Sequence, residues 1–219
     1  MALVPGRKDT FIDQNVKDGL NLSQIEAIDV QKKLINEWEP KSEVMALQYG
    51  SFIIGTTSSM SALMINSIFR RKLKLRSAGQ FITSFGLMVA SGGMSLIGHE
   101  LFITNDILLY KNQCPVCYEM KASLFLNGTG ILYPLLLSPS LNLAIAGSVG
   151  LRTPHIFEIK QVVGFWWNVV KPAINHISLA FCINSVIASL VVYKQYGQMN
   201  NIANILKRIE DKQSENSLT

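Results

Sequence analysis

The sequence predicts an all-α membrane protein with about four transmembrane helices and an N-terminal amphipathic helix on the membrane surface. Only 16% of its 219 residues are charged, well below the ~25% of ordinary soluble domains, while 48% are hydrophobic. Four stretches without Lys, Arg, Asp or Glu can each supply the ~20 residues of a membrane-spanning helix: 44–69, 77–99, 122–151 and 172–193. Four such stretches would leave a soluble chain of this length too little polar surface.

The N-terminal segment, residues 1–43, is predicted to be polar and to end in the amphipathic helix. Ser23 and Glu26 have the spacing of a capping box, which indicates a helix start. Pro40 should end the helix. Because this segment has neither the apolar core of a signal peptide nor the acid-poor character of a mitochondrial presequence, we expect targeting information in the spans. One stripe of the helix carries the apolar residues Ile25, Ile28, Ile35 and Trp38.

The transmembrane domain is predicted at 44–193, and its first two spans, at about 46–68 and 78–98, are rich in Gly, Ser and Thr. Apolar helices have little hydrophobic reason to associate in lipid, so close approach through small residues replaces that driving force. We therefore expect helix–helix interfaces on these spans. Gly55 and Gly92 are the positions at which we expect membrane partners to make contact.

The third span is predicted at 121–138, with a broken, partly re-entrant continuation to about 150, because Pro134 and Pro139 remove backbone donors. Trp166 and Trp167 fit an interfacial belt that leads into a fourth span at 172–193. Residues 194–219 should form a C-terminal polar helix and tail.

Five cations separate the first two spans and indicate a tight loop of a transmembrane hairpin. The positive-inside tendency places this loop on the matrix or cytoplasmic side and both termini opposite, although the total cation counts near the two faces are equal. A basic loop can also bind anionic lipid head groups such as those of cardiolipin. We expect no nucleic-acid partner, since no aromatic stacking platform accompanies the cations. The cations are Arg70, Arg71, Lys72, Lys74 and Arg76.

The pair Cys114 and Cys117 has CxxC spacing, which suits a disulfide, two free thiols, a redox pair or half of a zinc site. A zinc site lacks an obvious second pair of ligands, and a quinone-linked thiol oxidoreductase would need a second cysteine pair, which this chain lacks. His99 and His176 fall near predicted membrane boundaries, where an interfacial structural role or a proton relay is open. We expect no cofactor and no metal.

Several short blocks resemble the transmembrane protein 126 family in their order and spacing. They are Asn66-Ser-Ile-Phe-Arg-Arg71, Cys114-Pro-Val-Cys117, Ile131-Leu-Tyr-Pro134, Leu143-Ala-Ile-Ala-Gly-Ser148 and Lys171-Pro172. The resemblance implies a multi-pass protein of the mitochondrial inner membrane that assists assembly of the membrane arm of respiratory complex I (NADH:ubiquinone oxidoreductase). It further implies a non-catalytic scaffold whose partners are membrane-arm subunits and other complex I assembly factors.

Two further functions remain open from the residues alone. A small membrane thiol oxidoreductase would use Cys114 and Cys117. A transporter would need several inward-facing charged groups, and the spans offer almost none. The absence of nucleotide-binding, metalloprotease and serine-hydrolase motifs leaves an enzyme without support.

Overall fold

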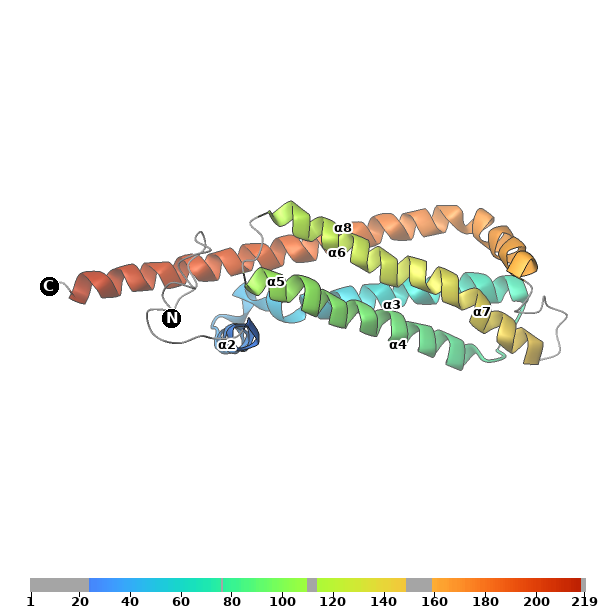
Figure 1. The fold of residues 1–219 in the computed structure, drawn as a ribbon, viewed down its shortest axis with the longest axis horizontal. Helices are drawn as coiled ribbons and strands as arrows, with labels where there is room; N and C mark the ends of the chain where they lie inside the picture. Colours follow the sequence, from blue (N-terminus) through green and yellow to red (C-terminus); the bar gives the residue numbers. More distant parts are fainter. Residues whose placement is uncertain (1–23, 76, 110–113, 149–158, 218–219) are drawn as a thin grey trace.

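The chain forms an elongated bundle of helices in a computed structural model that describes residues 24–75, 77–109, 114–148 and 159–217 (Figure 1). These residues form helices and turns and contain no strand, which confirms the all-α prediction. In chain order the elements are α2 (Gln24–Glu37), the 3₁₀ turn η1 (Lys41–Glu43), α3 (Met45–Leu73), α4 (Gln80–His99), the π turn η2 (Glu100–Thr104), α5 (Asn105–Leu108), α6 (Pro115–Asn127), the π turn η3 (Gly128–Leu132), α7 (Tyr133–Ser148) and α8 (Ile159–Ser217).

Within the described residues, four helical segments are long and apolar enough to cross a bilayer, as predicted. They are Met45–Leu73, Gln80–Leu108, Pro115–Ser148 and Trp166–Ile209. The second and third each combine α-helix with a π turn: α4–η2–α5 and α6–η3–α7. The second span therefore continues past the predicted end at residue 98. The chain is a multi-pass membrane protein.

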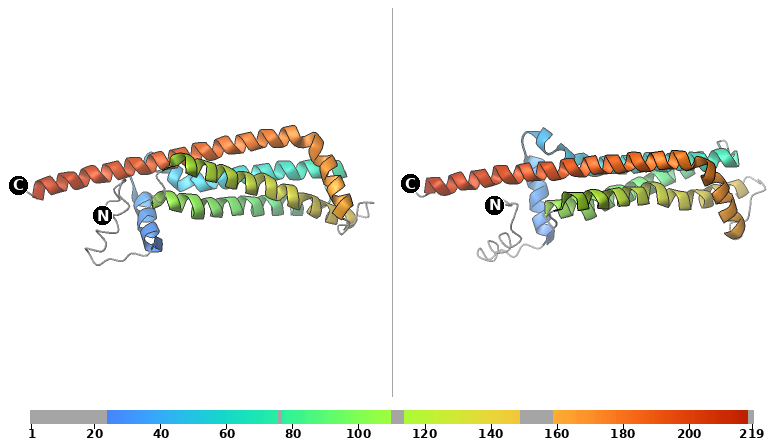
Figure 2. Two further views of the ribbon diagram at one scale, coloured as in Figure 1. Left: turned by 45° about the horizontal axis from the view of Figure 1, so that its top comes forward. Right: turned by 90° about the horizontal axis from the view of Figure 1, so that it is seen from above.

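α3 lies at the centre of the bundle and packs against α4, α7 and α8. It runs antiparallel to both α4 and α8, while α2 lies across the end of the bundle at which α3 begins (Figure 2). Ala27, Gln31 and Ile35 form the buried face of α2, and Ile28 and Trp38 of the predicted stripe are partly buried. Ser23 lies outside the described residues.

α3 and α4 approach each other closely at two glycines. A Cβ atom at Gly92 would lie 3.0 Å from the backbone oxygen of Gly55 and against the Ser59 hydroxyl, so the two backbones meet here with no room for a side chain. The predicted small-residue interface thus exists within the chain. Because both glycines are buried in it, a partner contact at Gly55 and Gly92 stays an untested prediction.

The third span is a continuous helical segment from Pro115 to Ser148, so the predicted break and re-entrant continuation are wrong. A proline at position 139 cannot donate to the carbonyl of Leu135, one turn earlier. The Trp166 indole Nε1 donates to that carbonyl instead, at 3.0 Å. A side chain from α8 therefore satisfies the acceptor that Pro139 frees, and the helix continues at membrane depth.

α8 unites three predicted pieces in one helix: the Trp-rich segment, the fourth span and the C-terminal polar helix. Its first part, which contains Pro172, turns across the end of the bundle, and its last part extends beyond the other end (Figure 2). Trp166 is half-buried against α7 rather than placed in an exposed interfacial belt, whereas Trp167 is exposed. The predicted boundary between residues 193 and 194 falls inside α8.

The interior of the bundle contains apolar clusters together with hydrogen-bonded polar side chains, and its exterior is apolar. Ser58 Oγ and Ser91 Oγ lie 2.8 Å apart, Ser91 Oγ donates to the Thr129 carbonyl at 2.8 Å, and Ser61 Oγ donates to Asn184 Oδ1 at 3.0 Å. Large apolar side chains cover the outside of α4, including Phe81, Ile82, Phe85, Val89 and Ile97. This arrangement suits lipid, because small polar side chains associate helices there while apolar ones face the acyl chains.

We expect Gly92→Leu to lower the free energy of unfolding by about 1–3 kcal/mol, the usual cost of overpacking. The added side chain would meet Gly55 and Ser59 and force α3 and α4 apart. Thermal unfolding in mild detergent would measure the loss. Gly86→Leu is the matched control on the same helix, because a Cβ there has no atom within 4 Å. Equal midpoints for the two variants would contradict the close approach.

Candidate functional site

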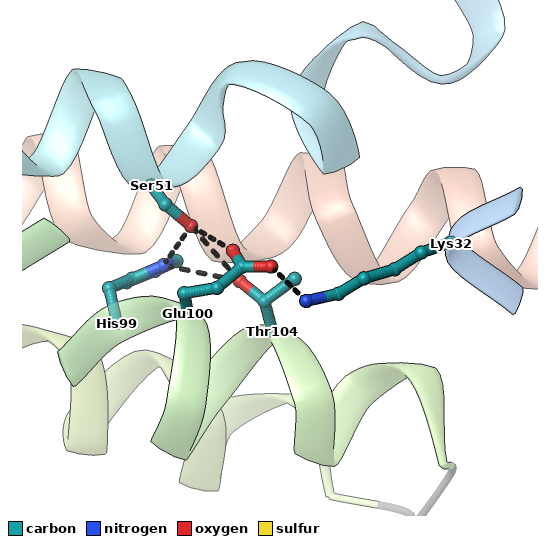
Figure 3. Close-up of polar contacts among 5 residues, drawn as sticks. All are labelled: Lys32, Ser51, His99, Glu100 and Thr104. Atoms are coloured by element: carbon teal, nitrogen blue, oxygen red, sulfur yellow. Dashed lines mark hydrogen bonds and ion pairs between the residues drawn. The ribbon is translucent and has the colours of Figure 1, made fainter. Parts of the chain in front are cut away.

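A cluster of ionisable and hydroxyl side chains lies where α2 crosses the bundle (Figure 3). Glu100 is at its centre, in the π turn η2. One carboxylate oxygen, Oε1, lies 2.7 Å from Lys32 Nζ of α2, and the other, Oε2, accepts a hydrogen bond of 2.6 Å from Ser51 Oγ of α3. The cluster therefore connects the surface helix, the central helix and the second span. Its five members are Lys32, Ser51, His99, Glu100 and Thr104.

His99 is the fully buried member of this cluster. Its Nδ1 lies 3.2 Å from Ser51 Oγ and 3.3 Å from Thr104 Oγ1. Its Nε2 is buried and has no hydrogen-bond partner among the described residues. The π turn begins directly after His99, and its wider backbone spacing lets His99, Glu100 and Thr104 reach the same serine of α3.

The bonding order decides what this cluster can do chemically. It runs from Lys32 to Glu100 to Ser51 to His99, so the serine proton points to the carboxylate and not to the imidazole. A hydrolytic triad needs the opposite arrangement, with the imidazole holding the serine proton and the carboxylate orienting the imidazole. The cluster can fasten α2 to the bundle, or pass a proton between His99 and Glu100 through the Ser51 hydroxyl. Both roles predicted for His99 thus remain open.

A second polar network lies at the opposite end of the bundle and contains Arg70. The Arg70 guanidinium is buried; Nη1 donates to Thr83 Oγ1 at 3.1 Å and Nη2 to the Ala78 carbonyl at 2.9 Å. Asn142 Nδ2 donates to Asn66 Oδ1 at 2.8 Å beside it. The network joins α3, α4 and α7 through paired polar groups, as a buried charge in a membrane requires.

The predicted basic loop needs correction at its first residues. α3 continues through Arg70, Arg71 and Lys72 to Leu73, and Lys74 ends it in the left-handed conformation with φ of 51°. Arg70 is occupied inside the bundle, so it is not a free lipid contact. Arg71, Lys72 and Lys74 are exposed. Arg76 lies outside the described residues.

The CxxC pair begins the third span at the opposite end of the bundle from the basic residues (Figure 1). Cys114 caps α6, and both cysteines are exposed free thiols. A hydrogen bond from Cys117 lowers the pKa of the Cys114 thiol from its ordinary value. Cys182 lies in the spanning part of α8, and no group of three or more His, Cys, Asp or Glu side chains converges in the part of the chain that the structure describes. The two thiols are therefore reactive candidates without a metal-site geometry around them.

Sequence reasoning missed the partners of Glu100 and Arg70. Both residues border charge-free runs; the sequence places Arg70 in the predicted basic loop and indicates no partner for Glu100. A charge that a helix carries into the bundle needs a buried partner. The signal was the number of Ser, Thr and Asn side chains in the spans, but one sequence does not show which of them lie opposite each charge.

Comparison with known proteins gives a consistent result along most of the chain. The family model described as Transmembrane protein 126 matches residues 25–209. A Drosophila melanogaster protein named Transmembrane protein 126 is 24% identical over 94% of each chain. Two proteins named Transmembrane protein 126A are similarly related: the mouse protein is 24% identical over 72% of this chain and 79% of its own, and the human protein 24% over 80% and 88%. No solved structure matches significantly.

We expect Ser51→Ala to lower the free energy of unfolding by about 1–3 kcal/mol and to loosen α2. The substitution leaves the Glu100 carboxylate and the His99 imidazole short of a buried hydrogen-bond partner. Thermal unfolding and backbone hydrogen exchange in α2 would measure the two effects. Thr56→Ala is the control on the same helix, since that exposed hydroxyl bonds to the Ile53 carbonyl of its own helix. Unchanged exchange in α2 would show that the cluster does not hold it.

Proposed function

This chain belongs to the transmembrane protein 126 family, and we propose that it is a mitochondrial inner-membrane assembly factor for the membrane arm of respiratory complex I. The match to the family over residues 25–209 carries the proposal, because the family resemblance implies this role. The multi-pass membrane fold supports it. In this role the protein acts as a non-catalytic scaffold, and its partners are membrane-arm subunits and other complex I assembly factors.

The surface of the spans supports a scaffold role. Only 28–44% of the most apolar part of each span is buried within the chain, so most of the apolar helix surface faces outward. On α4 this surface includes the stacked rings of Phe81 and Phe85, whose centroids lie 5.3 Å apart. Such a surface can cover apolar or loosely packed faces of an incompletely assembled subunit until its permanent neighbours arrive.

The binding should be reversible for a physical reason. Lipid tails are as apolar as the side chains on these faces, so burying the faces against a subunit gains little hydrophobic free energy. The strong polar contacts are used inside the bundle, among pairs such as Ser61 with Asn184. A scaffold that uses its strong polar contacts between its own helices and presents apolar outer faces can therefore release a subunit when a better-packed neighbour competes for it.

The parts of the chain outside the spans offer a second kind of contact. On α2, Val30, Lys33 and Leu34 are exposed beside a groove shared with α8. The end of α8 extends beyond the bundle, with Lys207 and Arg208 exposed (Figure 1). Both elements lie at the same end of the bundle. Assembly factors that approach from one side of the membrane would meet both.

The alternative function, a thiol oxidoreductase, has less support. Cys114 and Cys117 are adjacent and exposed, as a redox pair needs. The remaining cysteine, Cys182, lies in the membrane-spanning part of α8 and cannot form the second pair that electron transfer to a quinone would require.

We expect cells without this protein to contain less mature complex I and to accumulate partial membrane-arm intermediates, with the other respiratory complexes at normal levels. Native gel electrophoresis of mitochondrial membranes would measure this. Equal loss of all complexes would contradict the proposal and indicate a general role in membrane maintenance.

The same cells separate the scaffold from the oxidoreductase. Re-expression of the Cys114→Ser/Cys117→Ser double variant should restore complex I as fully as the wild-type chain, because a scaffold needs no thiol chemistry. Gly92→Leu, which disturbs the bundle itself, serves as the variant expected to restore less. Failure of the double-cysteine variant at normal protein levels would favour the oxidoreductase.

We also expect the basic residues at the end of α3 to face the matrix and the Cys114–Cys117 pair to face the intermembrane space. Translocating several cations across an energised membrane costs about 2.3 kcal/mol per charge per 100 mV. An impermeant maleimide should label the two cysteines in mitoplasts with an intact inner membrane, after reductant if they are oxidised. Labelling only after the membrane is opened would invert the orientation and place the termini in the matrix.

A further inference from the structure

The end of α3 and the first part of α8 line a groove of about 580 Å³. The two segments lie at the same end of the bundle (Figure 1). The groove has the volume of a typical small-molecule site. It opens on the outside of the bundle, at the end of the first span. The lining residues are Met64, Ser67, Ile68, Arg71 and Lys72 of α3 and Val169, Pro172, Ala173 and His176 of α8.

The lining of this α3–α8 groove changes from apolar to cationic along α3. Met64, Ile68 and Lys72 are spaced four residues apart, so they lie on one face of the helix in order from the middle of the span to its end. Ser67 and Arg71 are also four residues apart and line the groove beside Ile68 and Lys72, with the cation again nearer the end of the helix. A membrane phospholipid has this order too, with acyl chains toward the middle of the bilayer and a phosphate at its surface.

The charge around the groove is of one sign. None of the lining residues is acidic, and among the described residues no carboxylate pairs with Arg71 or Lys72. The described acidic residues lie at the other end of the bundle, in or beside α2, η1, η2, α5, the first turns of α6 and the last turns of α8 (Figure 1). A negatively charged occupant would therefore meet two cations, with no carboxylate of the described residues beside them.

Arg70 has a structural role, unlike the two cations that follow it in the sequence. Its guanidinium is buried and bonded to Thr83 and to the Ala78 carbonyl, whereas the next two side chains are exposed at the groove. The bundle thus satisfies the Arg70 guanidinium with internal hydrogen bonds and leaves the side chains of Arg71 and Lys72 available to bind a ligand. This separation cannot be read from the run of five cations in the sequence.

We propose that the α3–α8 groove binds one anionic phospholipid of the surrounding bilayer. Arg71 and Lys72 hold the phosphate, the His176 imidazole lies on the polar rim, and an acyl chain lies along Met64, Ile68 and Ala173. Arginine suits the phosphate because its planar guanidinium can form two parallel hydrogen bonds to the oxygens. The site requires only the membrane-spanning fold, so it stands apart from the assembly role.

The test uses the full chain purified in mild detergent and native mass spectrometry with cardiolipin and, as the neutral lipid, phosphatidylcholine. Cardiolipin should bind more tightly than phosphatidylcholine, and Arg71→Gln/Lys72→Gln should weaken cardiolipin binding about thirtyfold. Lys194→Gln/Lys207→Gln, which removes the same charge from exposed positions on α8, should leave binding within about twofold of wild type.

A second variant tests the groove itself. Ser67→Phe fills the groove from an exposed position without changing charge, and should also weaken cardiolipin binding. If only Arg71→Gln/Lys72→Gln weakened cardiolipin binding, the lipid would bind to a basic surface, and the proposal that it occupies the groove would be wrong. Displacement of the lipid by an equal concentration of inorganic phosphate, or equal binding of phosphatidylcholine, would overturn the lipid assignment. Unchanged thermal midpoints in both variants would show that the losses do not come from unfolding.

Discussion

The close approach of α3 to α4 at Gly55 and Gly92 is the contact on which the bundle depends. With the two backbones this near, short hydroxyl side chains can reach across: Ser59 Oγ donates to the Met88 carbonyl at 3.0 Å, and Ser58 meets Ser91. Larger residues at either glycine would separate the helices beyond the reach of these bonds. In lipid, where apolar packing alone gives little preference for one helix pair over another, this geometry selects the partner. The positions of α7 and α8 follow, since both pack on α3.

Much of the fold could be predicted because membrane spans depend on length and composition. Each of the four charge-free stretches overlaps one observed span over most of its length, and the small residues of the first two do form a helix interface. The prediction for the third span was wrong because a proline at position 139 indicates a helix break when only its neighbours in the sequence are considered. The Leu135 carbonyl, which Pro139 leaves without a donor, accepts from Trp166 on another helix. Local sequence rules contain no information about such a distant donor.

The candidate sites were less predictable for the same reason. Arg70 and Arg71 are neighbours in the sequence and belong to the same cationic run, yet one is bonded inside the bundle and the other is exposed at the groove. Their difference comes from the 100° rotation between successive helix residues, which turns one side chain toward α4 and the next away from it. Likewise, Glu100 is bound to Lys32 only because α2 crosses the bundle at its level.

The hydrogen bond from Trp166 to the Leu135 carbonyl has a consequence for how the last helix finds its place. In an uninterrupted α7 every interior carbonyl would already be occupied, and its surface would offer no polar feature to distinguish one depth from another. Pro139 leaves the Leu135 carbonyl without its usual donor at a defined depth, in a solvent that supplies no competing donor. The Trp166 indole of α8 meets this acceptor, so a proline in one helix fixes the depth at which the next helix lies in the membrane.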